Sequence, residues 1–460
     1  MNIPWSHRDG LDPDAPPPDD FPQRAWCFSS DWLDHGLART LGLEAVAATV
    51  ENVHYLPGRH LKVVYRLAPG HLPERVTLDF ATPADTGPDD PAPAPAPAQP
   101  GRSGPGRWLP DIRARAWLWP DDPADLPVAR WMSPTHLRRD MPRVVAQDLP
   151  ATARLLPRVL TYAPGERLAV HWRPEAWSPD SSHGAGWVMK AQREGVADTR
   201  ALHRLWRDRS RRWDMAEPLD DPQETSPDAA DSVRWERFLP GERLEAVAAR
   251  DGWTRVLQQA ARALVALHRQ ALDGLDHLPR HEGALEHALL DRKVMRRFRS
   301  ALPQLADRAQ ALSDRLGRAM PVPGSRPIAL LHGDLHTGNL LCQPDGRIAF
   351  IDLDSLKLGD PAFDLALLST RLMLVGLLDP SQGSALAEPL AAWPQTYIDA
   401  GGDPALLPSY GWHVATLLLS RQVKTCVRHH APDMTRLANA LLTQAEALCP
   451  RLPERPQTAC

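Results

Sequence analysis

Residues 328–366 read IALLHGDLHTGNLLCQPDGRIAFIDLDSLKLGDPAFDLA, and this stretch decides the fold that we expect for the chain. It contains two apolar runs, at 329–331 and 348–351, and polar residues follow each of them directly. Short apolar runs bounded by turn residues are typical of buried strands. A Pro-Asp-Gly triplet at 344–346 supplies a tight turn between them. We therefore expect two strands whose ends deliver polar side chains to one site.

The polar residues of this stretch have a spacing that is typical of phosphoryl-transfer catalysis. His332, Asp334 and Asn339 fall on the loop after the first strand, in the pattern H-x-D-x-x-x-x-N. Asp352 and Asp354 fall at the end of the second strand. In such enzymes one aspartate orients the accepting hydroxyl and takes its proton, while an asparagine and a second aspartate hold the magnesium that bridges the phosphates.

Three linked motifs, HGDLHTGN, IDLD and GDPAFDLA, occur here in this order. They closely resemble the aminoglycoside phosphotransferase and choline kinase superfamily, relatives of the protein kinases in which the motif begins His-Gly-Asp. The resemblance implies that Asp334 is the catalytic base and that Asn339 and Asp352 are metal ligands. It also implies that His332 braces the loop.

The remaining aspartates of the stretch are open to more than one interpretation. Asp354 is either a carboxylate at or behind the metal, as in some members of the superfamily, or a helix cap. Asp360 and Asp364 lie where a Gly-Asp-Pro turn opens a helix, and acidic residues in the first turn suit the positive end of the helix dipole. We therefore predict structural roles for these two residues.

An internal echo precedes the motif region. Residues 53–66, VHYLPGRHLKVVYR, are repeated in form by residues 160–173, LTYAPGERLAVHWR. Both copies predict a strand, a Pro-Gly turn and a second strand. A third strand at 186–192 carries Lys190 and precedes a helix at about 196–206, which is the layout of a kinase small lobe. In that layout the lysine of the third strand pairs with the α- and β-phosphates of ATP.

The first copy has Leu78 and Asp79 where the lysine would fall, so we interpret it as a degenerate small-lobe copy or a cap. For the second copy, the acidic partner of the lysine is not obvious. Glu194 comes very early in the following segment, and Asp198 has a short side chain. The sequence therefore does not identify the acidic residue that pairs with Lys190.

Downstream, VRWERFLPGERL at 233–244 resembles the hinge of the superfamily. The resemblance implies that backbone groups around Glu236, Arg237 and Phe238 bind adenine. Apolar residues at helical spacing predict a helix at 253–267. Beyond residue 365 the pattern is again helical, at 365–378, 385–400, 409–428 and 433–448, and in the superfamily such helices shape the acceptor pocket. The side chains that we consider for acceptor binding are Trp393, Tyr397, Tyr410, Trp412 and Arg421. Aromatic residues at helical spacing are more often part of a core.

The fold class that follows is α+β, a two-lobed protein kinase-like fold with a small antiparallel-sheet lobe and a large, mainly helical lobe. We expect an additional N-terminal α+β module. The expected divisions are a disordered tail at 1–25, the module at 26–150 with a low-complexity loop at 85–107, the nucleotide-binding small lobe at 151–240, and the catalytic and substrate-binding large lobe at 241–460.

The composition of the chain limits the kinds of binding partner that we expect. Lys and Arg number 53 against 57 Asp and Glu, and the formal net charge of −4 gives no general attraction to nucleic acid or to a membrane surface. The N-terminus has no apolar segment of the kind found in signal peptides, and no run of about 18 apolar residues occurs. We therefore expect a cytoplasmic enzyme that uses ATP and Mg²⁺ to phosphorylate a hydroxyl of a small molecule.

Two alternatives remain at this level. The first is a nucleotide-binding but catalytically weak kinase relative that acts through a protein partner. The second is a protein kinase, which is disfavoured because His332-Gly333-Asp334 replaces His-Arg-Asp and no Ala-Pro-Glu activation segment follows Asp352. The acceptor, whether an aminoglycoside, a sugar or an amino alcohol, is not readable from the motifs.

Overall fold

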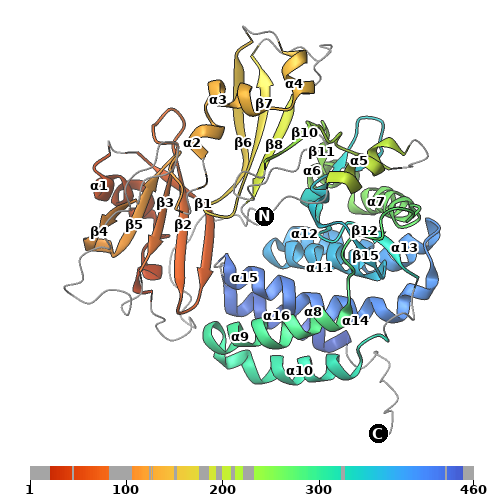
Figure 1. Ribbon diagram of the computed structural model, residues 1–460. Helices are drawn as coiled ribbons and strands as arrows, with labels where there is room; N and C mark the ends of the chain where they lie inside the picture. The colour runs from red at the N-terminus through yellow and green to blue at the C-terminus, as the bar shows by residue number, and fades with distance from the viewer. Residues whose placement is uncertain are drawn as a thin grey trace. The chain divides into compact units, whose positions relative to one another are not determined.

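The computed structural model describes residues 21–43, 46–81, 106–123, 126, 128–149, 153–175, 186–192, 199–208, 213–220, 233–322, 327–429 and 433–448. The chain divides into two compact units. The first comprises Met1–Val196, Leu219–Phe238 and Cys426–Met434, and the second comprises Ala197–Pro218, Leu239–Thr425 and Thr435–Cys460. The expected α+β content with antiparallel sheets is confirmed (Figure 1). The expected loop at 85–107 lies almost wholly outside the described residues.

The first unit begins with short helices and a five-stranded antiparallel sheet. The helices are η1 (Pro22–Ala25), η2 (Trp32–Gly36) and α1 (Leu37–Leu41). The strands are β1 (Ala48–Leu56), β2 (His60–Leu67), β3 (Arg75–Phe80), β4 (Arg107–Leu109) and β5 (Ala114–Leu118), in the order β1-β2-β3-β5-β4. Residues 21–25, which we assigned to a disordered tail, include this first helix turn, and Phe21 is buried. An aromatic ring that finds a buried site fixes its chain segment.

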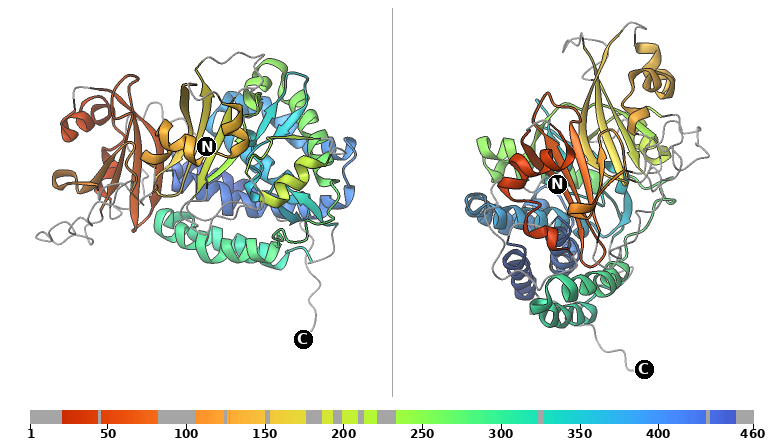
Figure 2. Two further views of the ribbon diagram at one scale, coloured as in Figure 1. Left: turned by 45° about the horizontal axis from the view of Figure 1, so that its top comes forward. Right: turned by 90° about the vertical axis from the view of Figure 1, so that its left-hand side faces the viewer.

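A second antiparallel sheet of the first unit contains β6 (Leu155–Ala163), β7 (Arg167–Pro174), β8 (Trp187–Gln192) and β10 (Val233–Arg237), in the order β10-β8-β7-β6. Figure 2 shows the two sheets, red to orange and yellow, from two further directions. Three short helices belong to the hydrophobic cluster on this sheet: α2 (Val128–Trp131), α3 (Pro134–Asp140) and α4 (Arg143–Asp148). Trp131, Leu137 and Val145 share that cluster with Trp172 and Trp187. Residues 128–145 therefore pack on the second sheet, although the expected boundary between module and small lobe stood at residue 150.

The second unit is mainly helical. Its helices are α5 (Thr199–Arg207), α6 (Leu244–Asp251), α7 (Trp253–His268), α8 (Gly283–Leu289), η5 (Leu290–Val294), α9 (Met295–Ala301), η6 (Pro303–Leu305), α10 (Ala306–Arg318), α11 (Ala362–Leu378), α12 (Pro380–Ala391), α13 (Trp393–Asp399), η9 (Pro404–Leu406), α14 (Leu407–Leu417), η10 (Leu418–Val423) and α16 (Met434–Leu448), with α15 (Lys424–Arg428) at its boundary with the first unit. Helix α11 packs on α12 and α14, and its first turns are buried.

Two small sheets of the second unit position the motif region. One has the order β11-β13-β14-β9, formed by β11 (Glu242–Arg243), β13 (Leu340–Cys342), β14 (Ile348–Phe350) and β9 (Asp214–Met215). The other pairs β12 (Ala329–Leu331) with β15 (Lys357–Gly359). Helical turns η7 (Thr337–Asn339) and η8 (Leu353–Ser355) follow β12 and β14. The two apolar runs of the motif stretch are therefore buried strands, as expected.

Two predicted helices are interrupted in the structure. The helix expected at 385–400 is divided into α12 and α13 at Ala392, because Pro394 lies in the first turn of the second helix and cannot donate a helical hydrogen bond. The helix expected at 409–428 contains the π-helical segment η10. Within the described residues, no helix is both long and apolar enough to cross a membrane.

Candidate active site

The loop after β12 is braced by its own histidine. His332 is fully buried, and its Nε2 lies 3.0 Å from the backbone oxygen of Ile351. Its Nδ1 accepts a hydrogen bond of 3.4 Å from the backbone N–H of Asp334. Both contacts are satisfied by a neutral ring that carries its proton on Nε2. The ring thus connects the Asp334 loop to the end of β14, which is the bracing position predicted for this residue.

Asp364 anchors the same loop from the first turn of α11. Its carboxylate accepts hydrogen bonds from the backbone N–H groups of His332 (2.7 Å) and Gly333 (3.0 Å). It also lies 3.3 Å from Nε2 of His268, whose Nδ1 lies 2.7 Å from the hydroxyl of Tyr397. Burial alone would raise the pKa of Asp364, but the hydrogen bond with His268 and the neighbouring donors lower it. Asp364 lies in the first turn of its helix, as predicted, and it also stabilises the loop.

The loop also brings Asn339 next to the strand end that carries Asp352. The Asn339 side-chain amide donates to the backbone oxygen of Asp334 at 3.0 Å. The backbone N–H of Ile351 donates to the backbone oxygen of Asn339, also at 3.0 Å. Because the amide nitrogen holds the loop, the side-chain oxygen of Asn339 is the atom that can meet a cation.

Asp352 has a left-handed backbone conformation, with φ of 59° and ψ of 49°. For a residue with a side chain this conformation costs about 1–2 kcal/mol, and it is retained mainly where the surrounding structure or a function requires it. Asp354 follows within η8 and is half-buried. The chain therefore places two carboxylates and one amide side chain around the end of β14.

The donor chemistry fits Mg²⁺. Among the described residues, no three His, Cys, Asp or Glu side chains come together in a way that could hold a metal ion. Phosphoryl-transfer enzymes, however, bind Mg²⁺ through one or two carboxylates together with the substrate's phosphates rather than in an all-protein cage. The side chains of Asn339 and Asp352 offer oxygen donors of the type that this kind of Mg²⁺ site uses.

His336 is a residue of the loop that we did not single out from the sequence. Its Nδ1 accepts the backbone N–H of Gly338 at 3.0 Å and caps η7. Burial lowers its pKa to about 4, although the charge of Asp334 acts in the opposite direction. The ring is therefore neutral at physiological pH and holds the turn that delivers Asn339. In the sequence, only its position two residues after Asp334 could have drawn attention to His336.

In the first unit, Lys190 has an acidic partner from the neighbouring strand. Lys190 lies on β8 opposite Arg234 of β10. Its Nζ lies 3.1 Å from one carboxylate oxygen of Glu236, and Arg234 lies 3.3 Å from the other. All three side chains are largely buried. The ion pair that the sequence left open is thus made by Glu236, while Glu194 and Asp198 lie outside the described residues.

The register of β10 shows which backbone groups of the predicted hinge lie on the outer edge of the strand. Glu236 pairs with Val188, and the N–H of Phe238 donates to the oxygen of Gly186 at 2.9 Å. Backbone groups of an antiparallel strand alternate between its two edges. The groups of Arg237 therefore point to the outer edge of β10, away from β8. Of the three predicted residues, Arg237 is the one whose backbone groups lie on the outer edge of the strand, and the ring of Phe238 stacks on His171 with the ring centroids 3.8 Å apart.

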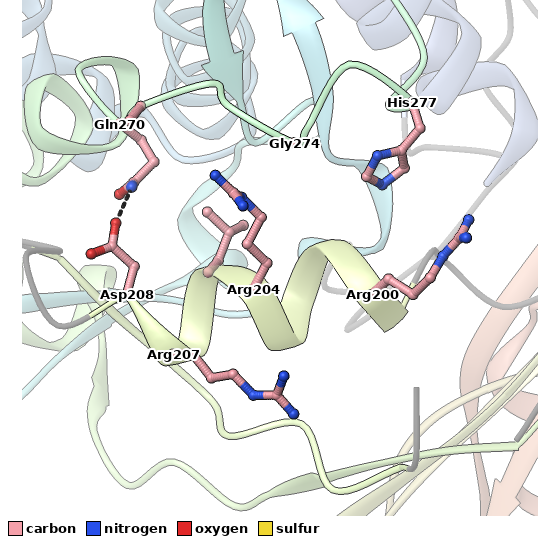
Figure 3. Close-up of a pocket in the computed structure, with 9 residues that line it drawn as sticks. Arg200, Arg204, Arg207, Asp208, Gln270, Gly274 and His277 are labelled. Atoms are coloured by element: carbon pink, nitrogen blue, oxygen red, sulfur yellow. Dashed lines mark hydrogen bonds between the residues drawn. The ribbon is translucent and has the colours of Figure 1, made fainter. Parts of the chain in front are cut away.

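A cavity of about 650 Å³ in the second unit is separate from the predicted site residues. It lies between α5 and the segment after α7, and Figure 3 shows Arg204 directed toward Gly274 on that segment. Its described lining is Arg200, Arg204, Leu205, Arg207, Asp208, Gln270, Ala271, Gly274 and His277. None of the predicted catalytic, nucleotide or metal residues belongs to this lining, so the cavity does not enter the assignment of the active site.

Comparisons with known proteins agree with the motifs. Residues 217–397 match the model of the phosphotransferase enzyme family. No curated protein matches the chain.

Solved structures that match this chain include a choline/ethanolamine kinase family protein from Mesorhizobium loti, with 17% identity, a TM-score of 0.43, and coverage of 70% of this chain and 93% of that one. A thermostable mutant of an aminoglycoside phosphotransferase, in a ternary complex with ADP and hygromycin B, has 16% identity, a TM-score of 0.44, and coverage of 64% and 93%. A spectinomycin phosphotransferase in complex with ADP and spectinomycin has 14% identity, a TM-score of 0.43, and coverage of 64% and 92%.

The matched segment contains the braced loop, Asn339 and Asp352, which are the features that carried the sequence resemblance. Over residues 217–397, this chain resembles the phosphotransferase enzyme family, as its three linked motifs predicted.

Proposed function

We propose that this protein is an ATP- and Mg²⁺-dependent phosphotransferase that phosphorylates a hydroxyl group of a small molecule. The observation that carries the proposal is the loop from His332 to Asn339. The loop is held by His332 from within and by Asp364 from α11, and its residues Asp334 and Asn339 lie close to the strand end that carries Asp352. A loop that is fixed in this way supplies the positioning on which phosphoryl transfer depends.

In the proposed reaction the acceptor hydroxyl attacks the γ-phosphorus of ATP. The bond from that phosphorus to the β–γ bridging oxygen breaks, and ADP leaves. Asp334 orients the hydroxyl and takes its proton. Asn339 and Asp352 would hold Mg²⁺, with Asp354 as a further carboxylate, and the bound ion would neutralise charge on the phosphate oxygens.

The nucleotide side of the proposal rests on the first unit. Lys190 steadies the α- and β-phosphates, and Glu236 orients its ammonium group from the neighbouring strand. The outward backbone groups of Arg237 contact adenine, with Glu236 and Phe238 fixing the strand on either side. In this proposal residues 151–240 act as the small lobe and residues 241–460 as the large lobe of a two-lobed kinase-like enzyme, which works in the cytoplasm.

The test is ATP consumption with a panel of hydroxylated small molecules, followed by the variants Asp334→Asn and Asp352→Asn. We expect each variant to lose at least about 100-fold in turnover, which is the lower end of what a positioned general base contributes. The matched control is Asp345→Asn in the exposed turn between β13 and β14, where, among the described residues, the carboxylate bonds Arg347 alone. This control keeps full activity.

Nucleotide binding is measured in parallel by thermal shift with ATP and Mg²⁺. Asp334→Asn keeps the shift because it lacks only the base, whereas Asp352→Asn loses the Mg²⁺-dependent part. Turnover near the wild-type level in either variant would exclude the mechanism. A thermal shift without turnover of any acceptor would favour the alternative of a catalytically weak nucleotide-binding relative.

A further inference from the structure

Lys357 lies beside the catalytic loop, although no motif assigned it a role. It is the first residue of β15 and pairs with Leu331, the residue before His332. A Cβ atom added at Gly333 would lie 2.4 Å from Cε of Lys357 and 2.1 Å from the backbone oxygen of Ser355. The lysine side chain therefore crosses the backbone of the loop one residue before Asp334, and only glycine fits beneath it.

The ammonium group of Lys357 has no anionic partner within the described part of the chain. Its Nζ makes neither a hydrogen bond nor an ion pair there, and its one specific contact is the ring of Phe363, whose centroid lies 5.6 Å away. Burial lowers the pKa of the ammonium group and the charge of Arg421 lowers it further, while the charges of Asp364, Asp334 and Glu286 act in the opposite direction. A half-buried cation that pairs directly with no carboxylate is costly unless something else balances its charge.

Arg421 is the second cation of this group, and its own partner is distant. Its Nε lies 3.8 Å from one oxygen of Glu286, and that same oxygen already accepts a hydrogen bond of 2.6 Å from Ser420. The Arg421 side chain is 36% exposed, whereas Glu286 is buried. Arg421 lies in the π-helical segment η10, and such irregular turns occur frequently at functional sites.

The other residues that we considered for acceptor binding do not compete with Arg421. Trp393, Tyr397 and Trp412 are all buried, with at most 2% of their surface exposed. Tyr410 bonds the hydroxyl of Ser369. Trp393, Tyr397 and Trp412 therefore serve the helical core, the half-buried Tyr410 is engaged by Ser369, and Arg421 is the charged member of the set that reaches solvent.

The carboxylates near Lys357 each have another task. Asp364 holds two backbone N–H groups and His268, and Glu286 is engaged by Ser420 and Arg421. Asp334 is the proposed base. The charge of Arg421 acts against the positive charge of Lys357, and an oxyanion bound by both side chains would remove that cost.

We propose that Lys357 and Arg421 bind an oxyanion of the acceptor, a carboxylate or a phosphate, while Asp334 receives the hydroxyl of the same molecule. The inference rests on the proposed function and names its substrate class. It predicts that the acceptor is an anionic hydroxylated compound and that a polycationic aminoglycoside is a poor one.

The test uses lysine acetylation, because the chain has only five lysines: Lys62, Lys190, Lys293, Lys357 and Lys424. The full chain is treated with N-acetoxysuccinimide, and the rate at each lysine is followed by mass spectrometry. The probes are D-glycerate against glycerol, and D-glucuronate and D-glucose 6-phosphate against D-glucose. The exposed Lys293 is the internal reference.

We expect at least one anionic probe to slow acetylation of Lys357 fivefold or more, while its uncharged counterpart leaves the rate unchanged. Comparing the glucuronate and phosphate arms distinguishes a carboxylate from a phosphate. Arg421→Met should abolish the protection. If no anionic probe protects Lys357, or if the uncharged compounds and hygromycin B protect it equally, the inference is overturned.

Failure of the proposed function would look different in the same experiment. ATP with Mg²⁺ should protect Lys190, and its failure to do so would contradict the proposed nucleotide site without bearing on Lys357.

A kinetic arm then uses Lys357→Met and Lys357→Arg. With the preferred anionic acceptor we expect the methionine variant to raise KM at least 30-fold with little change in kcat, and the arginine variant to restore most of the affinity. A fall in kcat at unchanged KM would overturn the inference.

Discussion

The two sheets of the first unit have the same pattern of strands, but their charged residues differ at equivalent positions. In the second sheet Lys190 pairs with Ala169 on one side and with Arg234 on the other. In the first sheet Asp79 holds the same place, opposite Lys62 and Arg115. Two residues further along, Glu236 of the second sheet corresponds by register to Trp117 of the first. The duplicated fold therefore retains its backbone while one copy lacks both the lysine and the glutamate.

The turns of the two hairpins differ in a related way. Both close with the same backbone hydrogen bond, from Arg59 to Leu56 and from Glu166 to Ala163, each at 3.0 Å. In the second hairpin the fully buried Asp122 also accepts hydrogen bonds of 2.9 Å from Gly165 N–H and from the hydroxyl of Tyr162.

Within the described residues, the first turn has no comparable side-chain clamp. Glu166 of the second hairpin, by contrast, is also bonded by Arg428 at 2.7 Å. The copy that retains the lysine is thus also the copy whose turn is fixed, which is the expected difference between a working nucleotide lobe and a scaffold.

The largest expected effect on ATP kinetics distinguishes Lys190 of the second sheet from Lys62 of the first. Lys190→Met should lower kcat/KM for ATP by about 100-fold or more, the loss typical of removing one electrostatic contact to the reacting group. Lys62→Met, in the first sheet, should stay within about twofold because its partner Asp79 is 3.7 Å away and no phosphate is expected there. Steady-state kinetics with varied ATP measure both. Equal losses in the two variants would contradict the assignment of one nucleotide lobe.

The next effect tests the clamp on the second turn. Asp122→Ala leaves Tyr162 and Gly165 without their buried acceptor, and each lost partner costs about 1–3 kcal/mol. We expect the free energy of unfolding in urea to fall by about 3 kcal/mol and KM for ATP to rise. Asp121→Ala at the adjacent, exposed position is the control and should change neither. A stable Asp122→Ala variant with unchanged KM would show that the clamp is dispensable.

A smaller effect depends on pH and concerns the edge of the second sheet. Burial raises the pKa of Asp220 to about 7, although the backbone N–H of Trp235 donates to its carboxylate. In the unfolded chain the pKa is about 4, so between about pH 4 and 7 the folded state binds more protons than the unfolded state. The contribution of Asp220 to stability therefore decreases as pH rises through this window.

Asp220→Asn removes this titration and keeps an acceptor for Trp235. The melting temperature of the variant should exceed that of the wild type by a difference that grows from pH 5 to pH 7 and then levels off, reaching about a few degrees. Thermal unfolding followed by circular dichroism measures it. A difference that is independent of pH would contradict the raised pKa.

The smallest effect is expected in the first sheet. Burial raises the pKa of Asp79, which weakens its ion pair with Lys62. Asp79→Asn should change the free energy of unfolding by less than about 1 kcal/mol, the usual range for a partly exposed pair, and should not change ATP kinetics. A large loss of activity in this variant would mean that the first sheet takes part in catalysis and is more than a scaffold.

Local sequence carried most of the fold in this chain. The two Pro-Gly turns each join a pair of strands, as predicted. The apolar runs at 329–331 and 348–351 form strands, and the residues 253–267 form a helix, all close to the expected bounds. The interruptions were harder to predict. Pro394 does divide a helix, but the sequence has no local signature for the π-helical turn at Arg421, which packs against α11, α14 and η5.

The candidate site also contains features that the local sequence predicts and features that it does not. The spacing of His332, Asp334, Asn339 and Asp352 predicted one braced loop, and the hydrogen bonds of that loop agree with it. The partner of Lys190 was sought on the following segment, yet Glu236 is supplied by a strand 46 residues later through the register of β8 and β10. Pairing between distant strands is decided by the whole sheet, so a single sequence does not reveal it.

The sequence alone was enough to predict phosphoryl-transfer chemistry, because that chemistry needs particular residue types at short spacings within one loop and one strand end. Which charges meet depended on the tertiary structure. It joined Lys190 to Glu236, set Asp79 opposite Lys62 and Arg115 in the first sheet, and set Lys357 across Gly333. These contacts depend on strand register and helix packing over long separations, and the free energy of the whole core selects them.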